Sequence, residues 1–188
     1  MALNKDFEEL FHHLNTANTK YLVVGAYAVI FYTEPRYTKD VNLWIKPDPE
    51  NAKKVYQALK RFGAPLRDLS VEDLCNPEMV YQLGIAPNRI DILMDIGGTS
   101  FEKAWKSKKV YHYGKEKLYI IDLANLIRSK KAAGRLQDQL DLGKLLKVGK
   151  KGQTRKTKRK TPSPPYYRPQ GGPLGRTSLP NRPQCLKY

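Results

Sequence analysis

The sequence predicts an α/β or α+β domain with a mixed β-sheet of four or more strands and flanking helices. Short apolar runs of strand length alternate along the chain with segments in which apolar residues recur at helical spacing. Glycine, proline and asparagine separate these segments, as expected for turns. A chain of 188 residues is long enough for one domain with a hydrophobic core and an appendage.

The first half of the chain contains three predicted helices and two predicted strands. Apolar residues at helical spacing predict the first helix, at 7–14, and Gly25 ends a buried strand just before a second helix can begin. Proline, aspartate and proline at 47–49 predict the start of the third helix, and Gly63 predicts its end. The elements are predicted at 7–14, 21–25, 26–32, 40–46 and 49–63.

The second half predicts the rest of the sheet and a C-terminal helix pair. Two strands flank the turn sequence "APN", and two more at 109–113 and 118–121 form a hairpin or lie at an edge. Asp122 is a suitable N-cap for a helix that breaks at Gly134. The elements are predicted at 79–85, 89–96, 101–105, 109–113, 118–121, 122–134 and 136–146.

The composition changes sharply at residue 150, which predicts a domain at 1–149 and a disordered, basic, proline-rich tail at 150–188. The tail holds 11 of the 34 basic residues, seven of the 13 prolines and no acid. Such a segment buries too little apolar surface to offset its ordering entropy. We expect a solvated tail, which need not be native to the domain; the alternative is a tail that holds RNA phosphates.

Composition also restricts the compartment and the class of protein. No apolar run is long enough to span a bilayer, and the N-terminus lacks the features of a signal peptide. Cys75 and Cys185 are the only cysteines, so neither a disulfide framework nor a thiolate metal site is expected. We therefore expect a cytoplasmic protein without a membrane partner.

Three separate features indicate one candidate site. Gly25, between a strand and a helix, lets the backbone approach a phosphate, and the N–H groups that follow point at the anion. Asp40 and Asn42 share one face of the strand at 40–46. Asp91 lies in the middle of an apolar strand, where it must be solvated, bound to a metal, or paired with Arg89 or another basic residue.

The order of these motifs resembles the nucleotidyltransferase superfamily of the DNA polymerase beta type, and in particular its minimal members related to abortive-infection and toxin–antitoxin proteins. The stretch "VVGAYAVIFYTEPRYTKDVNLWI" resembles the glycine turn, helix and paired-carboxylate strand of that group. "RIDIL" is similar to the strand that bears the third carboxylate, and "SKKAAGRLQDQLDL" to its C-terminal helix pair. The resemblance covers about residues 5 to 147.

The resemblance implies metal-dependent transfer of a nucleoside monophosphate from an NTP to a hydroxyl of RNA, such as tRNA, or of a protein. Two Mg²⁺ ions would be held at the positions of Asp40, Asn42 and Asp91, which are also the catalytic positions. The phosphates would be held by the amides of Gly25 and Ala26. An antitoxin protein is a further partner that the resemblance implies.

Basic residues near these motifs are candidates for pairing with the phosphates of the NTP. They are Lys130, Arg36 and Lys39. For Arg135, Asp138 and Asp141 the spacing along the last helix favours a structural polar network between helices instead.

The sequence departs from the family at two positions, which leaves two functions open. Ala26 stands where the family has glycine or serine, and Asn42 where it has aspartate. An amide supplies no negative charge for Mg²⁺. We expect a nucleotidyltransferase impaired by Asn42; the alternative is a non-catalytic module that binds NTP or RNA on the same fold.

Overall fold

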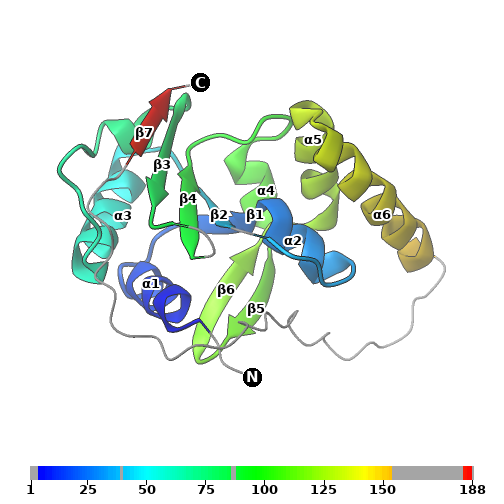
Figure 1. Ribbon diagram of the computed structural model, residues 1–188, viewed down its shortest axis with the longest axis horizontal. Helices are drawn as coiled ribbons and strands as arrows, with labels where there is room; N and C mark the ends of the chain where they lie inside the picture. Colours follow the sequence, from blue (N-terminus) through cyan, green and yellow to red (C-terminus); the bar gives the residue numbers. More distant parts are fainter. Residues whose placement is uncertain (1–3, 39, 86–87, 154–183, 188) are drawn as a thin grey trace.

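The computed structural model describes residues 4–38, 40–85, 88–153 and 184–187, and its elements confirm the predicted α/β class. Figure 1 shows a central mixed sheet with helices on both sides. The helices are α1 Lys5–Thr16, α2 Gly25–Tyr32, α3 Pro49–Phe62, the 3₁₀ turn η1 Asp73–Cys75, α4 Phe101–Ser107, α5 Leu123–Ala133 and α6 Leu136–Gln153.

The strands form one seven-stranded sheet with the order β5-β6-β1-β2-β4-β3-β7. β1 runs parallel to β6 and β2 parallel to β4, while the other neighbours are antiparallel. The strands are β1 Tyr21–Val24, β2 Asp40–Ile45, β3 Met79–Leu83, β4 Arg89–Leu93, β5 Lys109–Tyr113, β6 Glu116–Ile120 and β7 Gln184–Lys187.

The structure adds two features to the end of the chain that the sequence did not predict. Helix α6 continues to Gln153, past the expected domain boundary at 149, and β7 pairs with β3 from within the expected tail. Residues 154–183 and 188 lie outside the described part of the chain, so tail disorder stays a prediction. Within the described residues, no helix is long and apolar enough to cross a membrane.

The helix ends follow the predicted local chemistry. The side chain of Asp48 caps α3 by accepting from the backbone N–H of Asn51, and Pro49 occupies the first turn. Gly63 and Gly134 end α3 and α5 in the left-handed conformation, at φ 84° and 65°. Both angles favour glycine because it has no Cβ.

The two faces of the sheet carry different helices. Tyr21 of β1 stacks on Phe11 of α1, and α1 packs against α3. On the other face, Trp44 of β2 makes an edge contact with Phe101 of α4, and α2 packs against α5 and α6. The cores on both faces are apolar, and Figure 1 shows α1 with α3 apart from α2, α4, α5 and α6.

Asn51 is a buried polar residue that joins three elements. Its Oδ1 accepts from the N–H of Lys20 at 2.7 Å, and its Nδ2 donates to the carbonyls of Lys20 and Lys46. It therefore ties α3 to the start of β1 and the end of β2.

We expect Asn51→Ala to lower the free energy of unfolding by about 2–3 kcal/mol, because it leaves buried backbone groups without partners. Urea denaturation measures the change. Gln57→Ala on the exposed face of α3 is the control and should stay within about 0.5 kcal/mol of the parent. Equal stability of the two variants would contradict the bridging role of Asn51.

Candidate functional site

Strand register brings the three predicted site residues together. Asn42 of β2 lies opposite Val24 of β1 on one side and Asp91 of β4 on the other. Asp40 lies opposite Arg89, two residues before Asp91. Residues opposite one another in a sheet project to the same face, so these polar side chains share the face on which Trp44 meets α4.

The turn at Gly25 closes over Asn42. Gly25 has φ 62°, in the left-handed region, and a Cβ there would lie 3.0 Å from the side-chain amide of Asn42. Glycine is therefore favoured for both its backbone angle and its lack of a side chain. Helix α2 begins at this residue, and no side chain caps its first turn. The N–H groups of that turn, including Ala26, are suited to bind an anion.

Arg89 binds both carboxylates of the cluster. Its Nη2 donates to Asp40 Oδ2 at 2.9 Å and to Asp91 Oδ2 at 3.1 Å. Its Nε lies 3.0 Å from Asp91 Oδ1, close enough for an ion pair but not aligned as a hydrogen bond. Thr38 Oγ1 also donates to Asp40 Oδ1. The alternative that the sequence left open for Asp91, an ion pair with Arg89, is present in the structure.

The carboxylate of Asp91 is largely removed from solvent. The residue is 6 % exposed, and burial raises the pKa of its carboxyl from 3.8 to about 6. Arg89 opposes that rise in pKa, and the nearby Asp40 adds to it. The two carboxylates in turn raise the pKa of Arg89 against the effect of its own burial. Arg89 is thus the group that keeps Asp91 ionisable near neutral pH.

The residues present do not fit the two-magnesium site that the family resemblance implies. Only two carboxylates converge, because residue 42 is an amide, and no group of three histidine, cysteine, aspartate or glutamate side chains among the described residues could hold a metal ion. Arg89 already supplies a positive charge to both Asp40 and Asp91. The guanidinium therefore supplies positive charge where a metal ion would, while Asp91 Oδ1 has no hydrogen-bond partner among the described residues.

A second charged cluster joins the C-terminal helices to the segment before β2. Lys130 of α5 lies 2.5 Å from Asp138 and 3.1 Å from Asp141, both on α6. Arg36 also pairs with Asp141, at 3.0 Å. The predicted structural network is therefore present for Asp138 and Asp141, whereas Arg135 is exposed.

The pairing of Arg36 and Lys130 bears on their predicted role. Both cations face the fully buried Asp141, so a phosphate would have to compete with that carboxylate. Their binding of NTP stays a prediction. Lys39, the third basic residue predicted to bind phosphate, lies outside the described residues.

The sequence did not predict that Arg89 binds both Asp40 and Asp91, although part of this arrangement can be inferred from residue spacing. Arg89 and Asp91 are two residues apart in a strand, which places their side chains on one face. Its contact with Asp40 depends on the pairing of β2 with β4, which separate stretches of sequence do not specify.

Comparison with known proteins identifies the fold. No known family profile matches the chain, and no curated protein matches it. The structure is similar to the lincosamide antibiotic adenylyltransferase LnuA, solved with lincomycin bound, with a TM-score of 0.51, 14 % sequence identity, and coverage of 77 % of this chain and 97 % of that one. It is also similar to a proposed nucleotidyltransferase of Thermotoga maritima, with a TM-score of 0.45, 13 % identity, and coverage of 81 % and 94 %.

The fold is therefore nucleotidyltransferase-like: a mixed sheet flanked by helices, with α5 and α6 as a C-terminal pair. At 14 % identity the similarity to LnuA concerns the fold alone.

We expect the Asp91 carboxyl to titrate with a midpoint near pH 6, because burial outweighs the attraction of Arg89. Between about pH 4 and 6 the folded protein then holds a proton that an unfolded Asp has released, so the contribution of Asp91 to stability falls as pH rises through that range. Carbon-detected NMR of the side-chain carboxyl measures the midpoint.

Arg89→Gln should move this midpoint to higher pH, since it removes the cation that favours the ionised form. Arg61→Gln is the control, because Arg61 is an exposed residue of α3, and it should leave the midpoint in place. A midpoint near pH 4 in the parent protein would contradict the burial of Asp91.

Proposed function

We propose that this protein binds a nucleoside triphosphate at the Gly25 turn and that Asn42 impairs transfer of its nucleotidyl group. The observation that supports the proposal most directly is the position of that turn, beside the polar cluster and at the uncapped start of α2. Exposed N–H groups and the positive end of a helix attract phosphate. The nucleotidyltransferase-like fold supports the same ligand class.

The reaction proposed to be impaired is transfer of a nucleoside monophosphate to a hydroxyl of RNA, such as tRNA, or of a protein. Such chemistry depends on charges positioned around the phosphates. The cluster supplies two carboxylates where the resemblance implies three, and the Arg89 cation neutralises part of their charge. Both features weaken the positioning of metal ions. An antitoxin partner and the cytoplasmic location stay predictions from the sequence.

The second candidate is a non-catalytic nucleotide-binding module. The observation that favours it is the pairing of Arg89 with both carboxylates, because a fixed ion pair makes a stable site that requires no metal. Binding of NTP and transfer of nucleotide therefore need separate measurements.

We expect Ala26→Asp to weaken NTP binding at least tenfold. A carboxylate in the first turn of α2 repels phosphate, whereas it interacts favourably with the helix dipole, so the fold should be retained. Fluorescence anisotropy of a labelled ATP analogue measures binding, and thermal unfolding measures the fold. Ala26→Ser, which adds a neutral hydroxyl, is the matched control and should bind as the parent does. Undiminished binding by Ala26→Asp would place the phosphates elsewhere.

We expect the parent chain to transfer little label from radiolabelled NTPs to total tRNA or to protein in the presence of Mg²⁺. Asn42→Asp supplies a third carboxylate and should raise labelling above the parent. Asn42→Asp combined with Asp91→Asn is the control, and its labelling should return to the level of the parent. If Asn42→Asp binds NTP and labels no better than the parent, the non-catalytic module is the correct function.

A further inference from the structure

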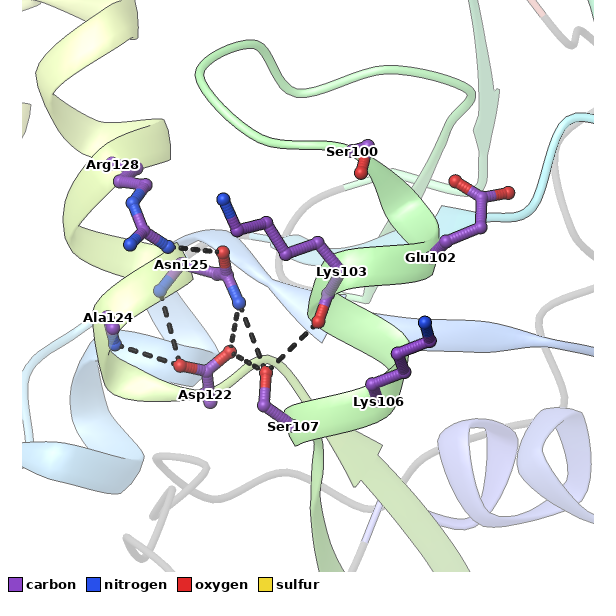
Figure 2. A pocket seen from close by; sticks show the side chains of 9 residues that line it. All are labelled: Ser100, Glu102, Lys103, Lys106, Ser107, Asp122, Ala124, Asn125 and Arg128. Atoms are coloured by element: carbon purple, nitrogen blue, oxygen red, sulfur yellow. Dashed lines mark hydrogen bonds between the residues drawn. The ribbon is translucent and has the colours of Figure 1, made fainter.

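A cavity of about 590 Å³ lies between α4 and α5, and none of its lining residues belongs to the Asp40–Arg89–Asp91 cluster. Figure 2 shows Lys103 and Lys106 projecting from α4 and Arg128 from α5, with Asn125 and Asp122 on the α5 side. The three basic side chains belong to exposed residues. Among the described residues, no carboxylate lies within ion-pair distance of these three side chains.

Two acids, Asp122 and Glu102, also line the cavity, and they differ in how they are bound. Asp122 accepts from the backbone N–H groups of Ala124 and Asn125 at the start of α5, and from the hydroxyl of Ser107. Its charge is therefore stabilised by the helix that it caps. Glu102 is exposed and lies 4.0 Å from Lys46, which binds Asp48 more closely, at 2.8 Å. Three basic residues against two acids leave the lining of the cavity with a small excess of positive charge.

A buried asparagine fixes one of the cations. Asn125 is 2 % exposed, and its Oδ1 accepts from Arg128 Nη1 at 2.8 Å and from Thr99 Oγ1 at 2.7 Å. Its Nδ2 donates to Ser107 Oγ and to Asp122. Every polar atom of this amide is used, so the side chain of Arg128 is oriented by a rigid network rather than left free.

The positive charge continues along the chain beyond the cavity. Residues 103–109 contain four lysines and no acid, and Nζ of Lys108 lies 4.0 Å from the centroid of the Trp105 ring and donates to the Trp105 carbonyl. Lys103 and Lys106 are three residues apart on α4, and Figure 2 shows Lys103 extending toward α5 and Lys106 on the side of α4 that carries Glu102. Several cations close together in the chain suit a ligand with repeated negative charge better than a single phosphate.

We propose that the cavity and the lysines of 103–109 bind the phosphodiester backbone of a single-stranded nucleic acid. Lysine and arginine neutralise successive phosphates without reading base sequence. The proposal deepens the proposed function, since it gives the place of an RNA partner on the same protein, but it does not require that the chain transfer nucleotides.

The position of α5 in the fold places this surface near the Gly25 turn. The N–H of Ile121, one residue before the cap of α5, donates to the carbonyl of Val23, two residues before Gly25. Both regions also lie on the face of the sheet that carries α4, because Phe101 packs on Trp44, two residues from Asn42. A nucleic acid held between α4 and α5 therefore lies on the side of the sheet that holds the polar cluster.

The full chain with Lys103→Ala and Lys106→Ala tests the proposal, with a labelled single-stranded RNA oligonucleotide as the probe. We expect binding to weaken at least about threefold in low salt, and the slope of log affinity against log salt to fall by about 0.7 for each phosphate that the protein no longer neutralises. Single-stranded DNA of the same sequence separates the two sources of a phosphodiester backbone: equal weakening indicates the backbone alone, and weakening confined to RNA indicates RNA.

The matched control is Lys53→Ala with Lys60→Ala, which removes the same charge from exposed positions of α3 on the opposite face of the sheet. It should bind RNA as the parent does. Lys103→Arg with Lys106→Arg keeps the charges and should restore binding. The proposal is overturned if both alanine pairs weaken binding equally, or if neither does.

NTP binding in the same variants separates this inference from the proposed function. We expect Lys103→Ala with Lys106→Ala to bind the labelled ATP analogue as the parent does. Loss of ATP binding with unchanged RNA binding would overturn the inference and assign the cavity to the nucleotide. If the RNA measurements come out as expected but the parent does not bind the ATP analogue, only the nucleotide site at Gly25 is refuted.

Discussion

The pairing of Arg89 with Asp40 and Asp91 is the interaction on which the candidate site depends. Two carboxylates on neighbouring strands, one of them buried, would repel each other and resist desolvation without a cation between them. Arg89 removes both costs, and it does so from the same strand as Asp91. The parallel pairing of β2 and β4 is what brings Asp40 next to Arg89, so the charge balance of the site depends on that pairing.

Residue 42 shows how charge and space are linked in this site. Its amide is neutral and lies against Gly25, where even a methyl group would come within 3.0 Å. A carboxylate at residue 42 would add negative charge next to Asp91 and beside a turn suited to phosphate. Asn42 avoids this repulsion, and it supplies no carboxylate to the two-ion site that the family resemblance implies.

In the described part of the molecule, charged side chains occur in two kinds of environment. Around Arg89 and around Asp141, partly exposed cations pair with carboxylates of which Asp91 and Asp141 are buried, and these pairs join strands and helices. Between α4 and α5 the N-terminus of α5 binds Asp122, and the three basic residues of the lining are exposed. The first arrangement is suited to structure, whereas the second is suited to an external polyanion.

The sequence by itself determined most of the elements and the two polar strands of the site. Apolar spacing, Asp48 and Asp122 as caps, and glycine at 63 and 134 are local signals, and they specify local structure. It also located Gly25, Asp40, Asn42 and Asp91. The pairing of β7 with β3, by contrast, joins segments about a hundred residues apart and has no local signal.

Only the tertiary structure decided which charges meet. The sequence made Arg36 and Lys130 candidates for binding phosphate, and it offered Arg89 as one possible ion-pair partner of Asp91. The fold places the first two on Asp141 and the third between Asp40 and Asp91. The physical reason is that an ion pair depends on distance across the sheet and between helices, and sequence spacing fixes that distance only within one element.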